Sequence, residues 1–116
     1  MNEQLIPVLF GLIGLICAYL LYRIIVSHSP GEGKAVSIAE AIHLGAMVFL
    51  KREYSILLAF VIIVAILISL SDLGLQTTAA FLVGAACSAL AGYCGMFAAT
   101  KANIRTTVAA NKKGPA

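Results

Sequence analysis

Charge is the scarcest property of this sequence. Only 11% of its 116 residues are charged, whereas a typical soluble domain carries about 25%. Hydrophobic residues make up 61%, and the mean hydropathy is +1.01. Only five residues are acidic: Glu3, Glu32, Glu40, Glu53 and Asp72. This balance excludes an ordinary soluble domain and predicts an all-α membrane protein, or a part of one.

Residues that build recognised sites are also few. The three cysteines, Cys17, Cys87 and Cys94, lie in apolar runs, and their spacing fits no zinc ligand set. The sequence contains no Walker loop, no His-Glu-x-x-His and no Gly-x-Ser-x-Gly. The acids are scattered, so a site that needs several converging carboxylates is not expected in this chain. We therefore assign no catalytic, cofactor-binding or metal-binding residue, and we expect no nucleic-acid partner.

Long uncharged runs are what the sequence has in abundance. Residues 4–22, 54–71 and 73–100 are uncharged over 19, 18 and 28 positions. A helix crosses the bilayer core with about 20 apolar residues. The first run lacks the basic start and the cleavage site of a signal peptide, so it is interpreted as a retained span. The runs predict three transmembrane helices at about 4–25, 54–71 and 78–100 in a single transmembrane unit, 1–116.

The segment between the first two runs has a different character. Ser37 and Glu40 have the spacing of a capping box, with Ser37 as the N-cap. Apolar and small residues then recur at helical spacing: Ile38, Ile42, Gly45, Ala46 and Phe49. The pattern predicts an amphipathic helix at about 37–53, lying along the cytoplasmic membrane surface and bending into the second span. Thr77 or Thr78 is expected to cap the third span.

Both histidines are interpreted as surface residues. His28 lies in the loop at 27–34, beside no other candidate ligand. His43 has no acidic residue at its i±4 positions. The sequence therefore favours a partly solvated His43 over a proton carrier.

The third span is rich in small residues. Gly84, Ser88 and Gly92 recur at every fourth position. They are joined by Ala85, Ala89, Ala91 and Gly95. Such a strip allows another helix backbone to approach closely, so we predict that this helix packs inside an assembly.

A polar tail, residues 101–116, follows the third span and is expected to be cytoplasmic. Lys101 and Arg105 lie four residues apart, on one face of a continued helix. One reading is a solvated cationic end that anchors at lipid headgroups. The other is that the tail docks against a neighbouring domain, or guides anions toward a site there. The sequence leaves both readings open.

The basic residues agree with one topology. With three spans, all eight fall on the side of the 23–53 connection and the tail, while Glu3 and Asp72 fall on the other. Cytoplasmic loops collect Lys and Arg. We therefore expect a multi-pass protein of the cell inner (plasma) membrane, with its N-terminus outside and its C-terminus in the cytoplasm.

Two long blocks resemble a known family. The block EAIHLGAMVFLKREY at 40–54 is similar to the opening of the second span of membrane-bound, ion-translocating pyrophosphatases. The blocks GAACSALAGYCGM at 84–96 and ATKANIRT at 99–106 are similar to their third span and its cytoplasmic end. The order and distance of the blocks also match, and together they cover most of residues 38–110.

The resemblance implies a function for the whole protein. The family hydrolyses pyrophosphate to two phosphates and uses the reaction to export protons or, in some members, sodium. Its members have about sixteen helices in two rings, which bury polar function inside a bundle, and work as homodimers. Pyrophosphate is bound with Mg²⁺ by residues of inner-ring helices further along the chain. The resemblance therefore implies an N-terminal, outer-ring portion with its small strip facing inner helices, inactive alone, and no Mg²⁺ bound by this segment.

A second hypothesis comes from a different class of protein. Three spans without a chemical motif would also suit a stand-alone structural or assembly subunit of a membrane complex.

Overall fold

The computed structural model describes residues 5–113 and consists of three helices joined by two short loops. They are α1 (Leu5–Ser27), α2 (Lys34–Leu70) and α3 (Gly74–Lys113). Each is long and apolar enough to cross a membrane. The predicted all-α membrane class with three spans is thereby confirmed. Residue 4 of the first expected span and residues 114–116 of the tail lie outside the described residues.

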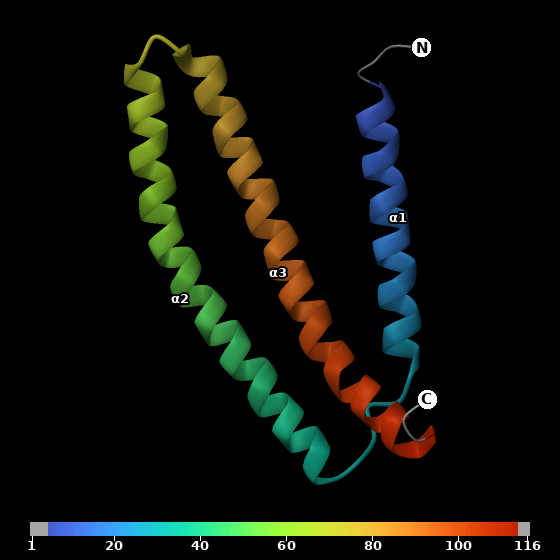
Figure 1. Cartoon of the computed structure of the whole chain (residues 1–116). Helices are drawn as coiled ribbons and strands as arrows, with labels where there is room; N and C mark the ends of the chain where they lie inside the picture. The colour runs from blue at the N-terminus through green and yellow to red at the C-terminus, as the bar shows by residue number, and fades with distance from the viewer. Residues whose placement is uncertain (1–4, 114–116) are drawn as a thin grey trace.

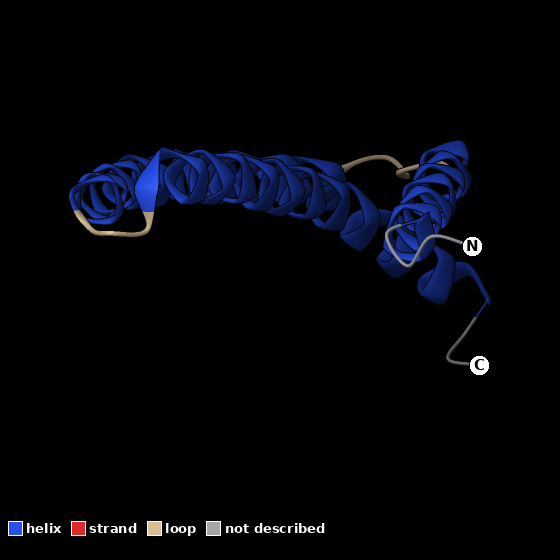
Figure 2. Cartoon of the chain, turned by 90° about the horizontal axis from the view of Figure 1, so that it is seen from above, coloured by secondary structure: helices blue, strands red, loops and turns tan. Residues whose placement is uncertain are grey.

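The helices form a long hairpin with one helix beside it. α2 and α3 run antiparallel and lie side by side along their length (Figure 1). Seen from above, α1 lies at one edge of this hairpin (Figure 2). Within residues 5–113, α1 contacts α3 and makes no contact with α2. The molecule extends 60 × 41 × 19 Å, so it is a thin layer and not a bundle with a closed core.

The contact surface between α2 and α3, here called the seam, is formed by residues that recur every three or four positions in each helix. They recur at this spacing because only one face of each helix contacts the other. On α2 the more protected residues are Val36, Ala39, His43, Ala46, Met47, Leu50, Tyr54, Val61, Val64, Ala65 and Ile68. On α3 they are Thr78, Phe81, Ala85, Ala89, Met96, Phe97, Ala98, Thr100, Lys101, Ala102, Ile104, Arg105 and Val108. Of the described residues only Leu50, Thr78, Thr100 and Ile104 are buried. Most of the apolar surface therefore faces outward.

The predicted capping box is wrong. α2 begins at Lys34, where Gly33 is the N-cap with φ +81° and makes no side-chain capping bond. Ser37 lies within the first turn, and its hydroxyl donates to the Lys34 carbonyl at 2.9 Å. Glycine reaches this left-handed backbone without strain, so the helix starts before the serine is reached.

The predicted threonine caps are wrong for the same reason. α3 begins at Gly74, which has φ +74°. The Thr77 hydroxyl donates to the Leu73 carbonyl at 2.8 Å, and the Thr78 hydroxyl donates to the Gly74 carbonyl at 3.3 Å. Both threonines bond backward along the helix, which is a common alternative for this side chain.

The expected amphipathic helix is not a separate element. Residues 37–53 are the first part of α2, which continues without interruption through the second expected span to Leu70. The expected bend between surface helix and span is therefore absent from the described backbone. α2 and the tail end of α3 extend together beyond the uncharged runs, as one hairpin (Figure 1).

The small-residue strip of α3 is divided between two faces. Tyr54 of α2 donates a hydrogen bond of 2.6 Å to the Ala89 carbonyl, and its hydroxyl lies 2.7 Å from the position that a Cβ on Gly92 would take. Gly84 and Gly95 have no described neighbouring atom within 4 Å of such a Cβ position. One part of the strip therefore receives α2, and the other part is exposed in this chain.

Candidate functional site

A polar cluster forms where the seam passes the end of the long uncharged run. His43 Nδ1 of α2 lies 2.6 Å from Thr100 Oγ1 of α3. The Thr100 hydroxyl is also 3.0 Å from the carbonyl oxygens of Met96 and Phe97. Because that hydroxyl donates along its own helix, it accepts from His43, which assigns the proton to Nδ1. His43 is half-buried, which agrees with the partly solvated side chain that the sequence favours, but the contact with α3 was not foreseen.

Aromatic rings extend the cluster along α3. Phe97 meets the His43 ring edge-on, with centroids 5.2 Å apart at 78°. Tyr93 stacks on Phe97 at 6.3 Å and 23°. Lys101 Nζ lies 5.8 Å from the Phe97 centroid, a distance at which a cation is attracted to the ring face. Tyr93, Phe97 and Lys101 thus form one face of α3 at four-residue spacing.

Arg105 joins the loop after α1 to α3. Its Nε donates to the His28 carbonyl at 2.9 Å, and its Nη1 donates to the Lys101 carbonyl at 2.6 Å. Nearby, Gly31 with φ +78° lies against Val108. Sequence reasoning placed Lys101 and Arg105 on one helix face, which the structure bears out, but it missed this contact between Arg105 and the loop.

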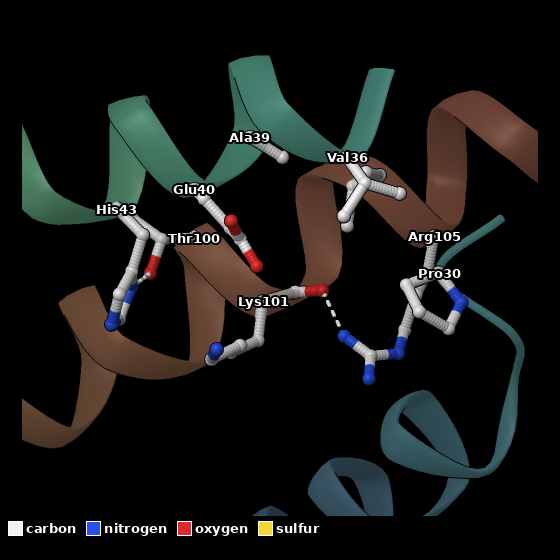
Figure 3. A pocket seen from close by; sticks show the side chains of 9 residues that line it. Pro30, Val36, Ala39, Glu40, His43, Thr100, Lys101 and Arg105 are labelled. Atoms are coloured by element: carbon white, nitrogen blue, oxygen red, sulfur yellow. Dashed lines mark hydrogen bonds between the residues drawn. The ribbon is translucent and has the colours of Figure 1, made fainter. Parts of the chain in front are cut away.

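These groups surround a cavity of about 140 Å³. Figure 3 shows the Glu40 carboxylate directed from α2 toward α3, while the Lys101 ammonium extends away from the Arg105 guanidinium. The complete lining is Pro30, Val36, Ala39, Glu40, His43, Thr100, Lys101, Ile104 and Arg105. The lining thus includes two cations, one carboxylate and one imidazole.

The described residues contain no group of three or more His, Cys, Asp or Glu side chains that could hold a metal ion. Mg²⁺ prefers an octahedral set of oxygen ligands that includes carboxylates. Glu40 is the single carboxylate in the cavity lining. The residues of this cavity therefore do not fit a magnesium centre.

We predict that Thr100→Val weakens the α2–α3 hairpin by about 1 kcal/mol, because it leaves His43 Nδ1–H without its acceptor. The check is an SDS titration that follows the distance between spin labels on α2 and α3. Thr107→Val is the matched control, since Thr107 is exposed and bonds only the Asn103 carbonyl of its own helix. Equal losses in the two variants would contradict a role for the His43–Thr100 bond.

A family model and the most similar curated proteins point to the same family. The family model described as inorganic H+ pyrophosphatase matches residues 12–116. A putative K(+)-stimulated pyrophosphate-energized sodium pump of Clostridium tetani is 48% identical over 103 residues. The K(+)-insensitive pyrophosphate-energized proton pump of Methanosarcina mazei is 41% identical over 104 residues. The K(+)-insensitive pyrophosphate-energized proton pump 2 of Moorella thermoacetica is 37% identical over 100 residues.

The chain spans only a small part of these relatives. The alignments cover 89%, 89% and 86% of this chain, but 15%, 16% and 15% of the Clostridium, Methanosarcina and Moorella proteins. No solved structure matches the chain.

Proposed function

Since this chain belongs to the inorganic H+ pyrophosphatase family, we propose that it forms the N-terminal portion of a pyrophosphate-energised cation pump. In that pump, hydrolysis of pyrophosphate would drive protons or sodium out of the cytoplasm. The observation that supports this is the family match over residues 12–116 together with 48% identity to a named pump. The stand-alone assembly subunit is not favoured, because it gives no reason for such a match.

The proposed role of this segment is that of scaffold. Its helices are exposed on most sides, and only four described residues are buried, so the segment has ample surface for further helices. Helices in membranes associate through close packing of small residues, which the exposed Gly84 and Gly95 would allow. Pyrophosphate and Mg²⁺ would be bound by other parts of the pump, since the cavity here lacks the ligands for that metal.

We further propose a plasma-membrane location with the C-terminal tail in the cytoplasm. The end of α1, the beginning of α2 and the end of α3 lie at the same end of the molecule (Figure 1). These segments carry Arg23, Lys34, Arg105 and Lys112. Lys and Arg collect on the cytoplasmic side. The complete pump is proposed to act as a homodimer. Names of the relatives include both a sodium pump and a proton pump, which supports Na+ or H+ as the proposed cation.

A chimeric pump tests the proposal. The matching segment of the Clostridium tetani relative is replaced by this chain, and Mg²⁺-dependent pyrophosphate hydrolysis and cation uptake are measured in inverted membrane vesicles. We expect the chimera to hydrolyse pyrophosphate and accumulate H+ or Na+. The same relative without the segment, and this chain alone, are expected to be inactive.

The control is a chimera that carries an unrelated three-span segment of similar length. Activity in this control would show that any hydrophobic segment suffices. An inactive but correctly inserted chimera with the present chain would overturn the proposal. Hydrolysis by the isolated 116-residue chain would contradict the assignment of the active site to other parts of the pump.

A further inference from the structure

One side of the α2–α3 hairpin carries an apolar groove with a volume of about 240 Å³. None of the described residues that line it is charged: Ala35, Ile38, Ala39, Ile42, Thr100, Asn103, Ile104 and Thr107. The groove shares Ala39, Thr100 and Ile104 with the polar cavity, and all three belong to the seam. Lys101 lines only the cavity and Asn103 lines only the groove, about 200° apart around α3, because a helix turns about 100° per residue. Groove and cavity therefore lie on opposite sides of the seam.

The outer wall of the groove is part of the apolar stripe that the sequence predicts on residues 37–53. Ile38 and Ile42 lie one turn apart on α2, and each is 54% exposed. Within residues 5–113, α1 makes no contact with α2, so α1 does not cover them. Exposed apolar surface of this kind is typical of sites that contact lipid or another protein. The position of the groove along α2 decides between the two.

The charges of α2 show where a bilayer would end along this helix. Lys51, Arg52 and Glu53 are consecutive, so they point in different directions around the helix, and all three are exposed. Charges are expensive inside a bilayer. The uncharged run that follows, 54–71, has 18 residues, or about 27 Å of helix, so nearly all of it is needed to cross about 30 Å of hydrocarbon. The border of the hydrocarbon therefore lies close to residues 51–53.

The groove lies beyond the reach of lipid. α2 is continuous from Lys34 to Leu70, so it leaves the bilayer instead of bending to lie along its surface (Figure 1). Ile42 and Ile38 precede Lys51 by nine and thirteen residues, which is about 14 and 20 Å along the helix axis. The headgroup layer on each side of a bilayer is only about 5–8 Å thick. Protein, and not lipid, is therefore the covering that fits this groove.

We propose that the groove binds an amphipathic helix from another part of the complete pump, one that also extends beyond the bilayer. This inference rests on the proposed function. The match covers 15% of the Clostridium relative, so most of such a protein is available to supply the helix. Large apolar side chains of that helix, at three- and four-residue spacing, enter the groove beside Ile38 and Ile42. Asn103 exchanges hydrogen bonds with polar groups at its edge. The uncharged lining does not suit a phosphate or another anion.

Thiol alkylation at position 42 tests this inference. Ile42→Cys is made in the isolated chain and in the chimera with the Clostridium tetani relative, and both are treated with N-ethylmaleimide in membrane vesicles. We expect rapid alkylation in the isolated chain and about tenfold slower alkylation in the chimera, because the reaction needs an exposed thiolate. Ala41→Cys is the matched control, since Ala41 is exposed and lines neither groove nor cavity. It should react at similar rates in both proteins. The native cysteines of the chain are first replaced by alanine: Cys17, Cys87 and Cys94.

Each outcome at position 42 has a distinct meaning. Equal alkylation in the isolated chain and in a chimera that hydrolyses pyrophosphate would overturn the inference and leave the proposed function intact. Protection at position 42 in an inactive chimera would support the inference and contradict the proposed function. Slow alkylation in the isolated chain would also overturn the inference, since lipid or a second copy would then cover the groove.

A polar substitution provides a second measurement. Ile42→Asn should leave the distance between spin labels on α2 and α3 unchanged in the isolated chain, because the side chain it replaces is 54% exposed there. In the chimera it should reduce pyrophosphate hydrolysis about tenfold, the effect expected when one buried aliphatic contact is lost. Ala41→Asn is the control and should retain activity. Equal hydrolysis by the Ile42→Asn and Ala41→Asn chimeras would contradict a helix in the groove.

Discussion

Replacing Gly31 with valine is expected to detach α1 from the hairpin. Gly31 has φ +78°, and a Cβ there would lie 2.7 Å from Val108 Cγ2 of α3. The left-handed backbone costs a residue with a Cβ about 1–2 kcal/mol, and forcing the contact costs about 1–3 kcal/mol more. Because the loop at 28–33 is the connection through which α1 reaches α3, the distance between spin labels on α1 and α3 should lengthen and broaden.

Two variants separate the backbone effect from the contact. Gly33→Val shares the positive φ, +81°, but no described atom lies within 4 Å of its Cβ position. It should therefore cost less and leave α1 in place. Val108→Ala combined with Gly31→Ala should restore much of the α1–α3 contact, since it removes the two methyl groups that crowd the loop. Detachment of equal size in the Gly31 and Gly33 variants would show that the Val108 contact is unimportant.

Gly92→Leu is expected to open the centre of the hairpin. The Tyr54 hydroxyl lies 2.7 Å from the position of the new Cβ and donates to the Ala89 carbonyl one turn away. A larger side chain at Gly92 must displace the tyrosine ring, so the hydrogen bond and the close packing are lost together. We expect a loss of about 2–3 kcal/mol in hairpin stability, measured by the SDS titration of the α2–α3 distance.

Two comparisons identify the cause of that loss. Tyr54→Phe removes the hydrogen bond without adding bulk and should cost about 0.5–1.5 kcal/mol. Gly95→Leu adds the same bulk three residues away, where no described atom lies within 4 Å, and should be neutral in the isolated chain. In the complete pump, Gly95→Leu should become harmful if further helices pack there. A neutral Gly92→Leu would refute the proposed packing of Tyr54 on this glycine.

The helices were predictable because their signal is local. An uncharged run of sufficient length has few alternatives to a helix that crosses the bilayer, and three such runs gave three helices. Their ends were less predictable. Serine and threonine suit both a cap and a backward bond within a helix, and the glycines at 33 and 74 decided between them. The expected bend before the second span is not found, because α2 remains helical through the charged residues 51–53.

Most contacts of the candidate site could not be predicted from the sequence, because they join residues that are far apart along the chain. His43 and Thr100 are 57 positions apart, and the search for a partner at i±4 could not reach across a hairpin. Arg105 and His28 are separated by 77 positions, and the bond uses a backbone carbonyl, which leaves no residue-type signal. The spacing of Lys101 and Arg105 was visible, as was the small strip, but not which part of the strip would receive Tyr54.

The length of the continuous helix α3 determines how much of it a bilayer can cover. Its 40 residues correspond to about 60 Å at 1.5 Å per residue, roughly twice the hydrocarbon thickness of a bilayer. α2 has 37 residues and lies beside α3, and each of the two helices is continuous within the described residues. About half of the length of this helix pair must therefore lie outside the hydrocarbon layer if the pair crosses a bilayer.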